Sequence, residues 1–345
     1  MEKEFRAFLE GRRETPERIE LALASVKDFE GYLTKNNVAL EETDLSLLKG
    51  YISLLIREGR NSEDRLVAVA RYCRFAKRND FFIYIAGLVN AREVLPGVAT
   101  RLGQVAGEEV RLRVFEGVEL PPLGAPQEAY PNLTKKIVQR MERELSQKKC
   151  REVLTWNYHE IPTEAFLGHK ERFERARDLD QYLRDEHRRF VEEIARSMNE
   201  GVAWYEQEIT PEVVEFVEAN QEISIGKRVG DRIYVTKIPF APKQFLEERD
   251  PRLKRYYACH CPLARTAIRD GQPEIPSTFC YCSAGYTKLA YDVIFGEPVE
   301  IEMLESVLKG DLRCRFFIKI PVGIMKFDDV GERSKKADPY HSTGL

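Results

Sequence analysis

Five of the chain's seven cysteines lie between positions 259 and 314. Four of them form two Cys-x-Cys pairs, Cys259 with Cys261 and Cys280 with Cys282, and Cys314 follows in GDLRCRFF. Thiolates gathered in one place repel one another unless a cation or a disulfide takes up their charge. The spacing therefore indicates a site with its own chemistry.

This cysteine pattern favours the binding of a metal ion. If a Cys-x-Cys pair lies on a strand, both side chains face the same side and present two sulfurs to one ion. Four thiolates in a tetrahedral array suit Zn²⁺. The candidate ligands outnumber the four that a structural zinc takes: Cys259, His260, Cys261, Cys280, Cys282 and Cys314.

Several interpretations of this set stay open. The cysteines could form a structural four-cysteine zinc site, or a three-ligand site whose open position accepts water or substrate. An Fe–S cluster also uses four thiolates. The simplest interpretation is that these cysteines are buried as small hydrophobic residues.

Catalysis is a second hypothesis. An activated thiolate at Cys280 or Cys282, or a water on an open-site zinc, would attack a carbon–nitrogen or similar bond. His159, in the segment TWNYHEIP, is a candidate general base, and His187 is a candidate on the apolar stripe of a long helix. For both histidines, a packing role is the alternative.

The overall composition indicates a soluble globular protein. The chain has 345 residues, so two or three domains are expected, and its formal charge of −3 provides no general attraction to nucleic acid or acidic membranes. The first residues lack the apolar core of a signal peptide, and no stretch approaches a membrane span. We therefore expect a cytoplasmic protein, where clustered cysteines act as ligands or catalysts rather than as disulfides.

The elements that must position these residues can be predicted from periodicity. Helix starts occur at Thr15-Pro16, Thr43-Asp44 and Asn61-Ser62, and the run FFIYIAGLV predicts a buried helix. Proline-rich residues 118–131 predict a linker. Beyond the linker, the pattern predicts a helix over 163–199, strands over 232–240, 299–308 and 314–322 with a tight hairpin turn between the last two, and a helix over 287–296.

These elements predict a multidomain chain of α and α+β parts, with helical N-terminal and middle regions and a C-terminal α+β domain of antiparallel strands that carries the cysteine metal site. The expected divisions are a helical domain at 1–117, a linker at 118–131, a helical region at 132–200, the cysteine-containing α+β domain at 201–326 and a tail at 327–345.

The C-terminal motifs resemble a known family. The segments Cys261-Pro262-Leu263-Ala264, Cys280/Cys282 before TKLAYDVIFG, and ESVLKGDLRCRFF are similar to the 4-vinyl reductase-like domains and the related L-2-amino-thiazoline-4-carboxylic acid hydrolase-like family. The resemblance covers about 254–320. It implies an α+β domain that binds a small molecule beside a zinc held by cysteines and a glutamate.

Carried over to this chain, the resemblance implies that Cys280 and Cys314 are ligands. Other family positions differ: the middle cysteine falls at Ser306 and the glutamate at Met303, with Glu305 as the nearest substitute. The extra cysteines, Cys259 and Cys282, would replace the missing ligands. The ligand set therefore stays open.

The N-terminal helices resemble the SAM-like core-binding domain of tyrosine recombinases, in EETDLSLLKGYISLLIREGRNSEDRLVAVARYCRFA. Residues 1–95 carry 16 basic and 16 acidic side chains and so no net charge, which argues against DNA binding. A local basic stripe is nevertheless present at Arg71, Arg74, Lys77 and Arg78. No recombinase catalytic set follows.

We therefore predict a zinc-binding protein whose C-terminal domain binds or senses a small molecule, aromatic or carboxylate-bearing, with no membrane partner. A metal- or thiolate-dependent hydrolase and a DNA-associated regulator are the alternatives. The sequence leaves a homodimer open.

Overall fold

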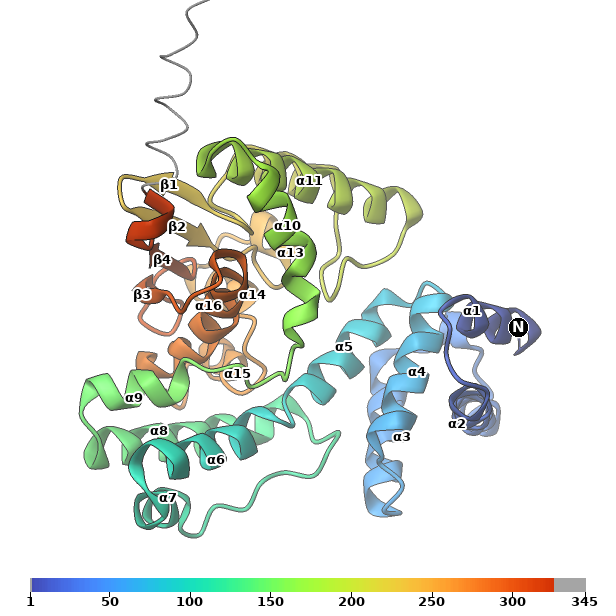
Figure 1. Cartoon of the computed structure of the whole chain (residues 1–345). Helices are drawn as coiled ribbons and strands as arrows, with labels where there is room; N and C mark the ends of the chain where they lie inside the picture. Colours follow the sequence, from blue (N-terminus) through green and yellow to red (C-terminus); the bar gives the residue numbers. More distant parts are fainter. Residues whose placement is uncertain (1, 326–345) are drawn as a thin grey trace, which may run out of the picture.

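A computed structural model describes residues 2–325 of the chain (Figure 1). The predicted tail, 327–345, lies outside these residues. Most of the described chain is helical, and one small antiparallel sheet lies in the C-terminal half. The predicted succession of helical N-terminal and middle parts and a C-terminal α+β part is confirmed.

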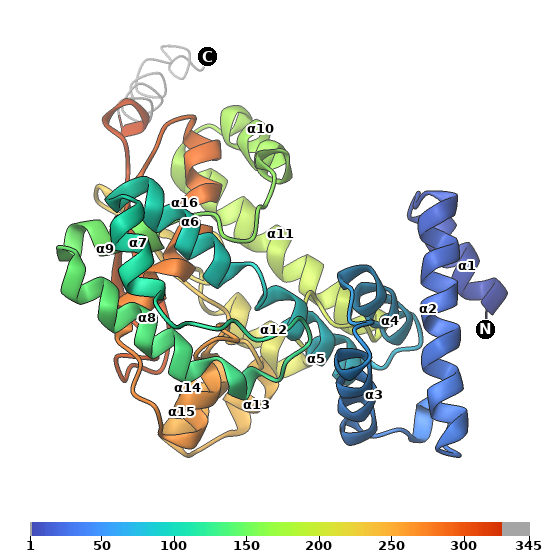
Figure 2. The ribbon, with the colours of Figure 1, turned by 90° about the horizontal axis from the view of Figure 1, so that it is seen from below.

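The chain begins with a helical bundle that has a hydrophobic core of its own. Its helices are α1 (Glu2–Gly11), α2 (Pro16–Lys35), α3 (Leu45–Arg57), α4 (Glu63–Phe75) and α5 (Asn79–Asn90). The Thr15 and Asp44 side chains cap α2 and α3 by accepting backbone N–H groups, as their positions predicted. Figure 2 shows α1 and α2 on the outer side of this bundle.

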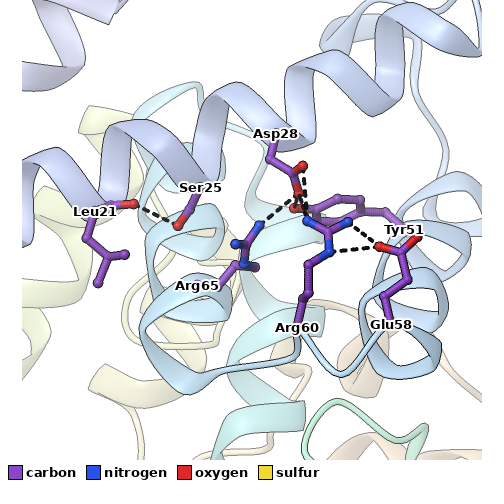
Figure 3. A network of polar contacts seen from close by, with 7 residues as sticks. All are labelled: Leu21, Ser25, Asp28, Tyr51, Glu58, Arg60 and Arg65. Atoms are coloured by element: carbon purple, nitrogen blue, oxygen red, sulfur yellow. Dashed lines mark hydrogen bonds and ion pairs between the residues drawn. The ribbon is translucent and has the colours of Figure 1, made fainter.

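A partly buried polar network ties α2 to the two helices that follow it (Figure 3). Asp28 accepts hydrogen bonds from the hydroxyl of Tyr51 at 2.9 Å and from the guanidinium groups of Arg60 at 3.0 Å and Arg65 at 2.8 Å. Arg60 also contacts Glu58. One carboxylate thus joins side chains from α3, α4 and the turn between them.

The next helices belong to a second hydrophobic core. They are α6 (Val94–Ala106), α7 (Glu108–Phe115), α8 (Pro131–Glu144) and α9 (Gln147–Leu154). Their buried residues form one cluster with Cys259, Ala284 and Phe316 of the C-terminal half. The cluster of the first five helices ends at Leu88. The segment 92–117 therefore packs with the C-terminal half, although the predicted first domain includes it.

The predicted linker, 118–131, is largely irregular, with one short 3₁₀ helix, η2 (Gln127–Ala129). It runs back along the N-terminal bundle. The side-chain amide of Asn61 donates to the carbonyl oxygen of Leu123 at 2.8 Å, and Gly124 lies against Ile52 and Leu66.

The prediction of one long helix over 163–199 is wrong, because three separate helices occupy this segment. These are the 3₁₀ helix η3 (Thr163–Phe166), α10 (Leu167–Arg175) and α11 (Leu179–Glu200). Asp178 starts α11 by accepting the backbone N–H of Gln181 at 2.7 Å, and this cap requires an extended residue at the break. A further helix, α12 (Pro211–Glu218), packs beside α11.

The sheet has the strand order β1-β2-β4-β3, with all neighbours antiparallel. The strands are β1 (Lys227–Val229), β2 (Arg232–Thr236), β3 (Glu300–Glu305) and β4 (Arg315–Lys319). The last three strands lie within predicted ones, whereas β1 was not predicted. Alternate residues such as Ile233, Val235 and Ile318 face a core built from α10, α11 and α16.

Short helices complete the C-terminal half: α13 (Pro242–Glu247), α14 (Pro251–Ala258), α15 (Arg265–Asp270), the 3₁₀ helix η4 (Ser277–Cys280) and α16 (Tyr281–Phe295). The predicted helix 287–296 is the later part of α16, which begins six positions earlier. The connection from β3 to β4 spans 306–314, so the predicted tight hairpin turn is wrong. Ser306 closes this loop by donating its backbone N–H to Asp311.

One helical run, Asn79–Ala106, is long and apolar enough to cross a membrane by length and composition alone, with a mean hydropathy of 1.3. Core helices of soluble proteins pass the same criteria, and 44% of the apolar window is buried inside the protein. The sequence analysis predicted that no stretch would approach a membrane span, and this run differs from that prediction by length and composition.

Replacing Asp28 by alanine should lower the free energy of unfolding by about 1–3 kcal/mol, because the buried Tyr51 hydroxyl loses its acceptor. Burial alone would raise the pKa of Asp28, but the hydrogen bonds from Tyr51 and Arg60 outweigh it and hold the pKa below its usual range. The contribution of Asp28 is therefore present at neutral pH and lost as the pH falls through the folded-state pKa.

Urea denaturation of the wild type and Asp28→Ala at several pH values measures this difference. Glu10→Ala on the exposed side of α1 is the control and should change stability by less than about 0.5 kcal/mol. An equal loss in both variants would contradict a special role for the Asp28 network.

Candidate functional site

The sheet and three chain segments bring the predicted cysteines to one end of β2 and β4. Lys237 directly follows β2, Cys314 directly precedes β4, and the Lys237 N–H donates to the Cys314 carbonyl at 3.0 Å. The pair Cys259–Cys261 lies between α14 and α15, and the pair Cys280–Cys282 lies at the start of α16.

Neither Cys-x-Cys pair lies on a strand, so the expectation that each pair presents its sulfurs to one side is wrong. Cys259 is the C-cap of α14, and Cys280 is the N-cap of α16, whose first turn holds Cys282. In a helix, residues two apart point about 200° from each other. The two sulfurs of the second pair are therefore not a ready-made half of a tetrahedral site.

The thiols are nevertheless close enough to raise the pKa values of one another. Burial, assisted by the nearby Cys314, raises the pKa of Cys259 to about 12. The pKa of Cys261 is raised by burial first and then by Cys259, Cys282 and Cys280. Since a thiol with a raised pKa is protonated at neutral pH, these groups are uncharged as they stand.

The six candidate ligands do not form a metal-ligand group as they are arranged. Across residues 2–325, no three His, Cys, Asp or Glu side chains are placed to hold one ion. The Nε2 atom of His260 lies 2.5 Å from the carbonyl oxygen of Ile238. The hydroxyl of Ser306, which the resemblance aligned with a cysteine, donates to the sulfur of Cys280 at 2.9 Å.

Glu305 is also engaged elsewhere. Its carboxylate pairs with the guanidinium of Arg313 at 2.8 Å and lies 3.6 Å from that of Arg315. These contacts hold the pKa of Glu305 below its usual range. The substitute glutamate thus neutralises two arginines and does not lie among the thiols.

A lysine that the sequence analysis did not single out lies among these thiols. Burial lowers the pKa of Lys237, while Cys314, Cys282, Cys261 and Cys259 each act against the shift. Its Nζ atom lies 5.3 Å from the centre of the Tyr286 ring. Among residues 2–325, no hydrogen bond or ion pair of this amino group is found, and the side chain keeps some exposed surface.

A second cation is buried close by. Arg265, the first residue of α15, is 7% exposed, and its guanidinium stacks on the Phe240 ring at 4.0 Å and the Tyr256 ring at 4.6 Å. Its Nε atom has no hydrogen-bond partner, and within the described part of the chain the guanidinium forms no ion pair. Thr266 beside it has a buried hydroxyl without a partner.

His260 connects the two cations. Burial first, and then Lys237 and Arg265, lower the pKa of His260 to about 3. The imidazole is therefore neutral at pH 7. Its ring lies edge-on to Phe240, with the two centres 5.6 Å apart. Lys237 and Arg265 are thus both neighbours of one uncharged ring.

The nearby acid is Glu206, which precedes α12. Burial raises the pKa of Glu206 to about 7, against the opposing effects of Arg265 and of a hydrogen bond from Asn90. A raised pKa weakens the negative charge that this carboxyl carries at neutral pH. It is therefore only a partial counter-ion for Arg265.

The predicted loop around His159 forms one side of the site. Trp156 lies against α16 at Gly285, where an added Cβ atom would be 2.5 Å from the Trp156 backbone nitrogen. The guanidinium of Arg101 stacks on the Trp156 ring at 4.0 Å. His159 keeps an exposed edge, while partial burial and then the positive charge of Lys237 lower the pKa of its ring.

His187 lies elsewhere. It is on the inner side of α11, and its Nε2 atom is 3.3 Å from the carbonyl oxygen of Glu218 in α12. No contact between His187 and the thiol-bearing segments is found in the described chain. The structure therefore brings the five cysteines, His260 and His159 to one region, and leaves His187 outside it.

Sequence reasoning missed Lys237 and Glu206, and it did not place Arg265 among the predicted site residues. A signal for Lys237 was present, since it is the charged residue within the apolar run of RIYVTKIPF. Arg265 is one of several basic residues around the cysteine motifs, and its type alone does not distinguish it from them. No comparable signal marks Glu206, because its burial depends on packing between distant segments.

Comparisons with known proteins add little to this geometry. Residues 241–324 match a protein family described as a family of unknown function (DUF6144). This match covers α13 to β4 and thus includes the five cysteines between positions 259 and 314. No curated protein and no solved structure matches the chain.

Replacing Gly285 by alanine should destabilise the protein by about 1–3 kcal/mol, because its Cβ would overlap the Trp156 backbone. Gly31→Ala, in the middle of α2 with open space around it, is the matched control and should stabilise by up to about 1 kcal/mol. Thermal unfolding of both variants compares them. A neutral Gly285→Ala would show that the 155–160 loop does not pack on α16.

The zinc prediction can be checked by mass-spectrometric metal analysis of protein purified without a metal-affinity tag. Binding would give about one zinc per chain, reduced in Cys314→Ser. Cys150→Ser is the control, because the sulfur of Cys150 faces the Met141 carbonyl and Cys150 is not among the thiols that act on Lys237. Metal-free wild-type protein of native fold would exclude a stable site.

Proposed function

We propose that this chain binds a small molecule with a carboxylate or similar anionic group, which Arg265 and Lys237 hold between them. One observation carries the proposal: Arg265 is 7% exposed, its Nε atom is buried without a hydrogen-bond partner, and its guanidinium has no ion pair among the described residues. A largely buried guanidinium with a buried nitrogen that lacks a hydrogen bond is an arrangement that folding alone does not favour.

The energetics support a ligand. Removing a charge from water without pairing it costs several kcal/mol, so buried charges are normally paired. Arginine differs from lysine in having five donors in a planar fork that matches a carboxylate. An anion at Arg265 would satisfy its donors and offset the cost of burial.

The surroundings favour a ligand with a flat apolar body. Phe240 and Tyr256 line the guanidinium, and Tyr286 lies beside the amino group of Lys237. Aromatic rings bind apolar and aromatic ligands through their faces and edges. This chemistry agrees with the resemblance to the 4-vinyl reductase-like group, which implies a small-molecule pocket.

Zinc binding is a second candidate, supported by the mutual influence of Cys259, Cys261, Cys280 and Cys314 on their pKa values. Since the side chains as placed do not form a ligand group, we derive no reaction step through a metal. In a zinc–thiolate centre, Lys237 and Arg265 would instead balance thiolate charge, so metal content decides between the two roles.

Thiol catalysis has less support. A cysteine nucleophile at Cys280 or Cys282 needs a lowered pKa, because the thiolate is the reactive form. Burial instead raises the pKa of both thiols. Hydrolysis by a free thiolate is therefore disfavoured in this arrangement.

DNA binding by the N-terminal bundle also has less support. In its local basic stripe, Arg71 pairs with Glu14 at 2.8 Å and Arg78 with Asp80 at 2.8 Å. Two of the four cations are thus already partly neutralised, whereas binding to phosphates needs free positive charge.

Arg265→Met tests the proposal without knowledge of the natural ligand. The variant keeps the apolar stem but removes the unpaired charge, so ligand-free protein should become more stable by about 1 kcal/mol or more. Arg269→Met is the control: Arg269 is partly exposed and paired with Asp270 and Glu128, so stability should change by less than about 0.5 kcal/mol. A strong loss of stability in Arg265→Met would contradict the proposal.

Binding is then measured by calorimetry with benzoate as the probe and benzyl alcohol as its uncharged counterpart. The wild type should bind benzoate more tightly than the alcohol, and Arg265→Met should bind benzoate roughly tenfold or more weakly, the effect of one charge-assisted hydrogen bond. Equal affinity of the wild type for both probes would show that no anion site exists.

A further inference from the structure

The N-terminal bundle contains a cavity that the proposed function does not use. It has a volume of about 240 Å³ and lies between the end of α1 and the helices α4 and α5. Val67, Arg71 and Arg74 line it from α4, and Phe82 and Val89 line it from α5. These spacings place the side chains on one face of each helix. The lining residues all belong to segment 8–90, so the cavity is distinct from the cysteine-containing region.

Two guanidinium groups lie on aromatic rings at this cavity. The guanidinium of Arg12, just beyond the end of α1, lies over the Phe8 ring at 4.7 Å from the ring centre. The guanidinium of Arg74 lies over the Phe82 ring at 5.1 Å. The Phe8 ring packs against Phe75, with the two ring centres 5.3 Å apart. Because cation–π contacts hold the guanidinium groups against the apolar wall, both charges are positioned in advance of a ligand.

These two cations have no counter-ion in the described chain. Arg71, the third guanidinium of the lining, pairs with Glu14 at 2.8 Å. For Arg12 and Arg74, no hydrogen bond or ion pair is found among residues 2–325. Within the same residues, no acidic side chain lines the cavity. Two unpaired positive charges therefore lie beside an apolar cavity.

The unpaired charges also act on each other. Burial first, and then the positive charge of Arg12, lower the pKa of Arg74. Like charges held at one site repel, so an anion that contacts both would remove an unfavourable interaction. Arg12 is exposed and Arg74 is half-buried, so both can meet a dissolved anion. The amide of Asn90 in the cavity wall is already engaged, since it donates to Glu206.

We propose that this cavity binds a small phosphate monoester, whose phosphate contacts Arg12 and Arg74 and whose apolar or aromatic body enters the cavity. A phosphate monoester carries a charge of about −1.5 to −2 at pH 7, which matches two unpaired cations. The planar guanidinium fork matches phosphate oxygens in pairs. This site is independent of the proposed function, because it involves other residues and the other core.

The apolar wall selects the body of the ligand. Phe8, Phe82 and Val89 offer ring faces and a branched aliphatic side chain, which suit a flat apolar group. Cavities for drug-sized ligands usually measure about 300–1,000 Å³. The volume of about 240 Å³ therefore favours a body no larger than a single ring.

Calorimetry on the full-length protein tests the proposal with phenyl phosphate as the probe. Inorganic phosphate lacks the ring, and phenol lacks the phosphate. The wild type should bind phenyl phosphate roughly tenfold or more tightly than either fragment, because the charge and the ring both contribute. Affinity should increase as the pH rises from about 5 to about 7, because the phosphate loses its second proton near about 6 while the guanidinium groups stay charged.

Arg74→Met keeps the apolar stem and removes the charge, so it should weaken phenyl phosphate binding roughly tenfold or more, the effect of one charge-assisted hydrogen bond. Arg57→Met is the matched control. Arg57 is an exposed arginine at the end of α3, outside the lining, so its replacement should change the affinity by less than about twofold.

Ala86→Phe tests the cavity separately from the charges. Ala86 lines the cavity from α5, and a phenyl group there would fill the space and leave both cations in place. Phenyl phosphate should then lose its advantage over inorganic phosphate. Circular dichroism checks that each variant is folded. If Ala86→Phe does not fold, the comparison of Arg74→Met with Arg57→Met decides.

Hydrogen exchange followed by mass spectrometry locates the bound probe. Phenyl phosphate should slow exchange in peptides that cover 8–14 and 67–90, because bound segments open less often. Peptides that cover 237–265 should not change, and Arg265→Met should keep the binding.

The outcomes separate this site from the anion site at Arg265. Equal affinity of Arg74→Met and the wild type would refute the cavity site. Equal affinity of the wild type for inorganic phosphate and phenyl phosphate would refute the role of the apolar cavity, and with it the proposal. If binding is lost in Arg265→Met and kept in Arg74→Met, the probe occupies the Arg265 site, so the proposed function stands and the cavity site fails.

Discussion

The pairing of β2 with β4 is the constraint on which the site depends. Five residues of each strand pair in antiparallel register from Arg232–Lys319 to Thr236–Arg315, and the next backbone contact joins Lys237 to Cys314. The register places the side chains of Ile233, Val235 and Ile318 in the core. A shift by one residue would turn this whole set outward. Core packing therefore fixes where the lysine and the cysteine meet.

Around Lys237 and Cys314 lie several polar groups, and the positive charges among them are not paired with negative charges. Two cations, Lys237 and Arg265, lie near one neutral histidine, several protonated thiols and a glutamate whose pKa is raised. Elsewhere the same chain pairs its charges closely, as in the Asp28 network or at Arg315, whose guanidinium binds Glu222 through two hydrogen bonds of 2.7 Å. This contrast agrees with the function that we propose for the site, because natural sequences usually break local rules where a ligand or a reaction requires it.

Much of the fold could be predicted because its signals are local. The caps at Thr15 and Asp44, the apolar periodicity of the first helices and the alternation in β2 and β4 depend on neighbours in sequence. The break before α11 was also local, in Asp178, but a periodic stripe across 163–199 obscured it. The Cys-x-Cys pairs were misplaced because a spacing of two suits a strand only if the backbone is extended, and here two helix ends carry them.

The candidate site was only partly predictable for a different reason. Cysteine spacing identified the segments, but the importance of Arg265 and Glu206 comes from burial and from missing or partial charge partners. Both depend on contacts between α5, α15 and the segment before α12, which are far apart in sequence. Charge type can be seen in a sequence, whereas the pairing of a charge cannot.

The hydrogen bond from Asn90 to Glu206 gives the two cores a thermodynamic link. Asn90 is the last residue of α5, a helix whose buried residues belong to the N-terminal core, whereas Glu206 lies beside Arg265 in the C-terminal half. Proton release from Glu206 changes the strength of this hydrogen bond. It therefore changes the free energy of the contact between the N-terminal bundle and the C-terminal half. Linkage is reciprocal. A partner that reorients the bundle therefore changes the free energy of proton release from Glu206, and with it the charge around Arg265, by the same coupling free energy.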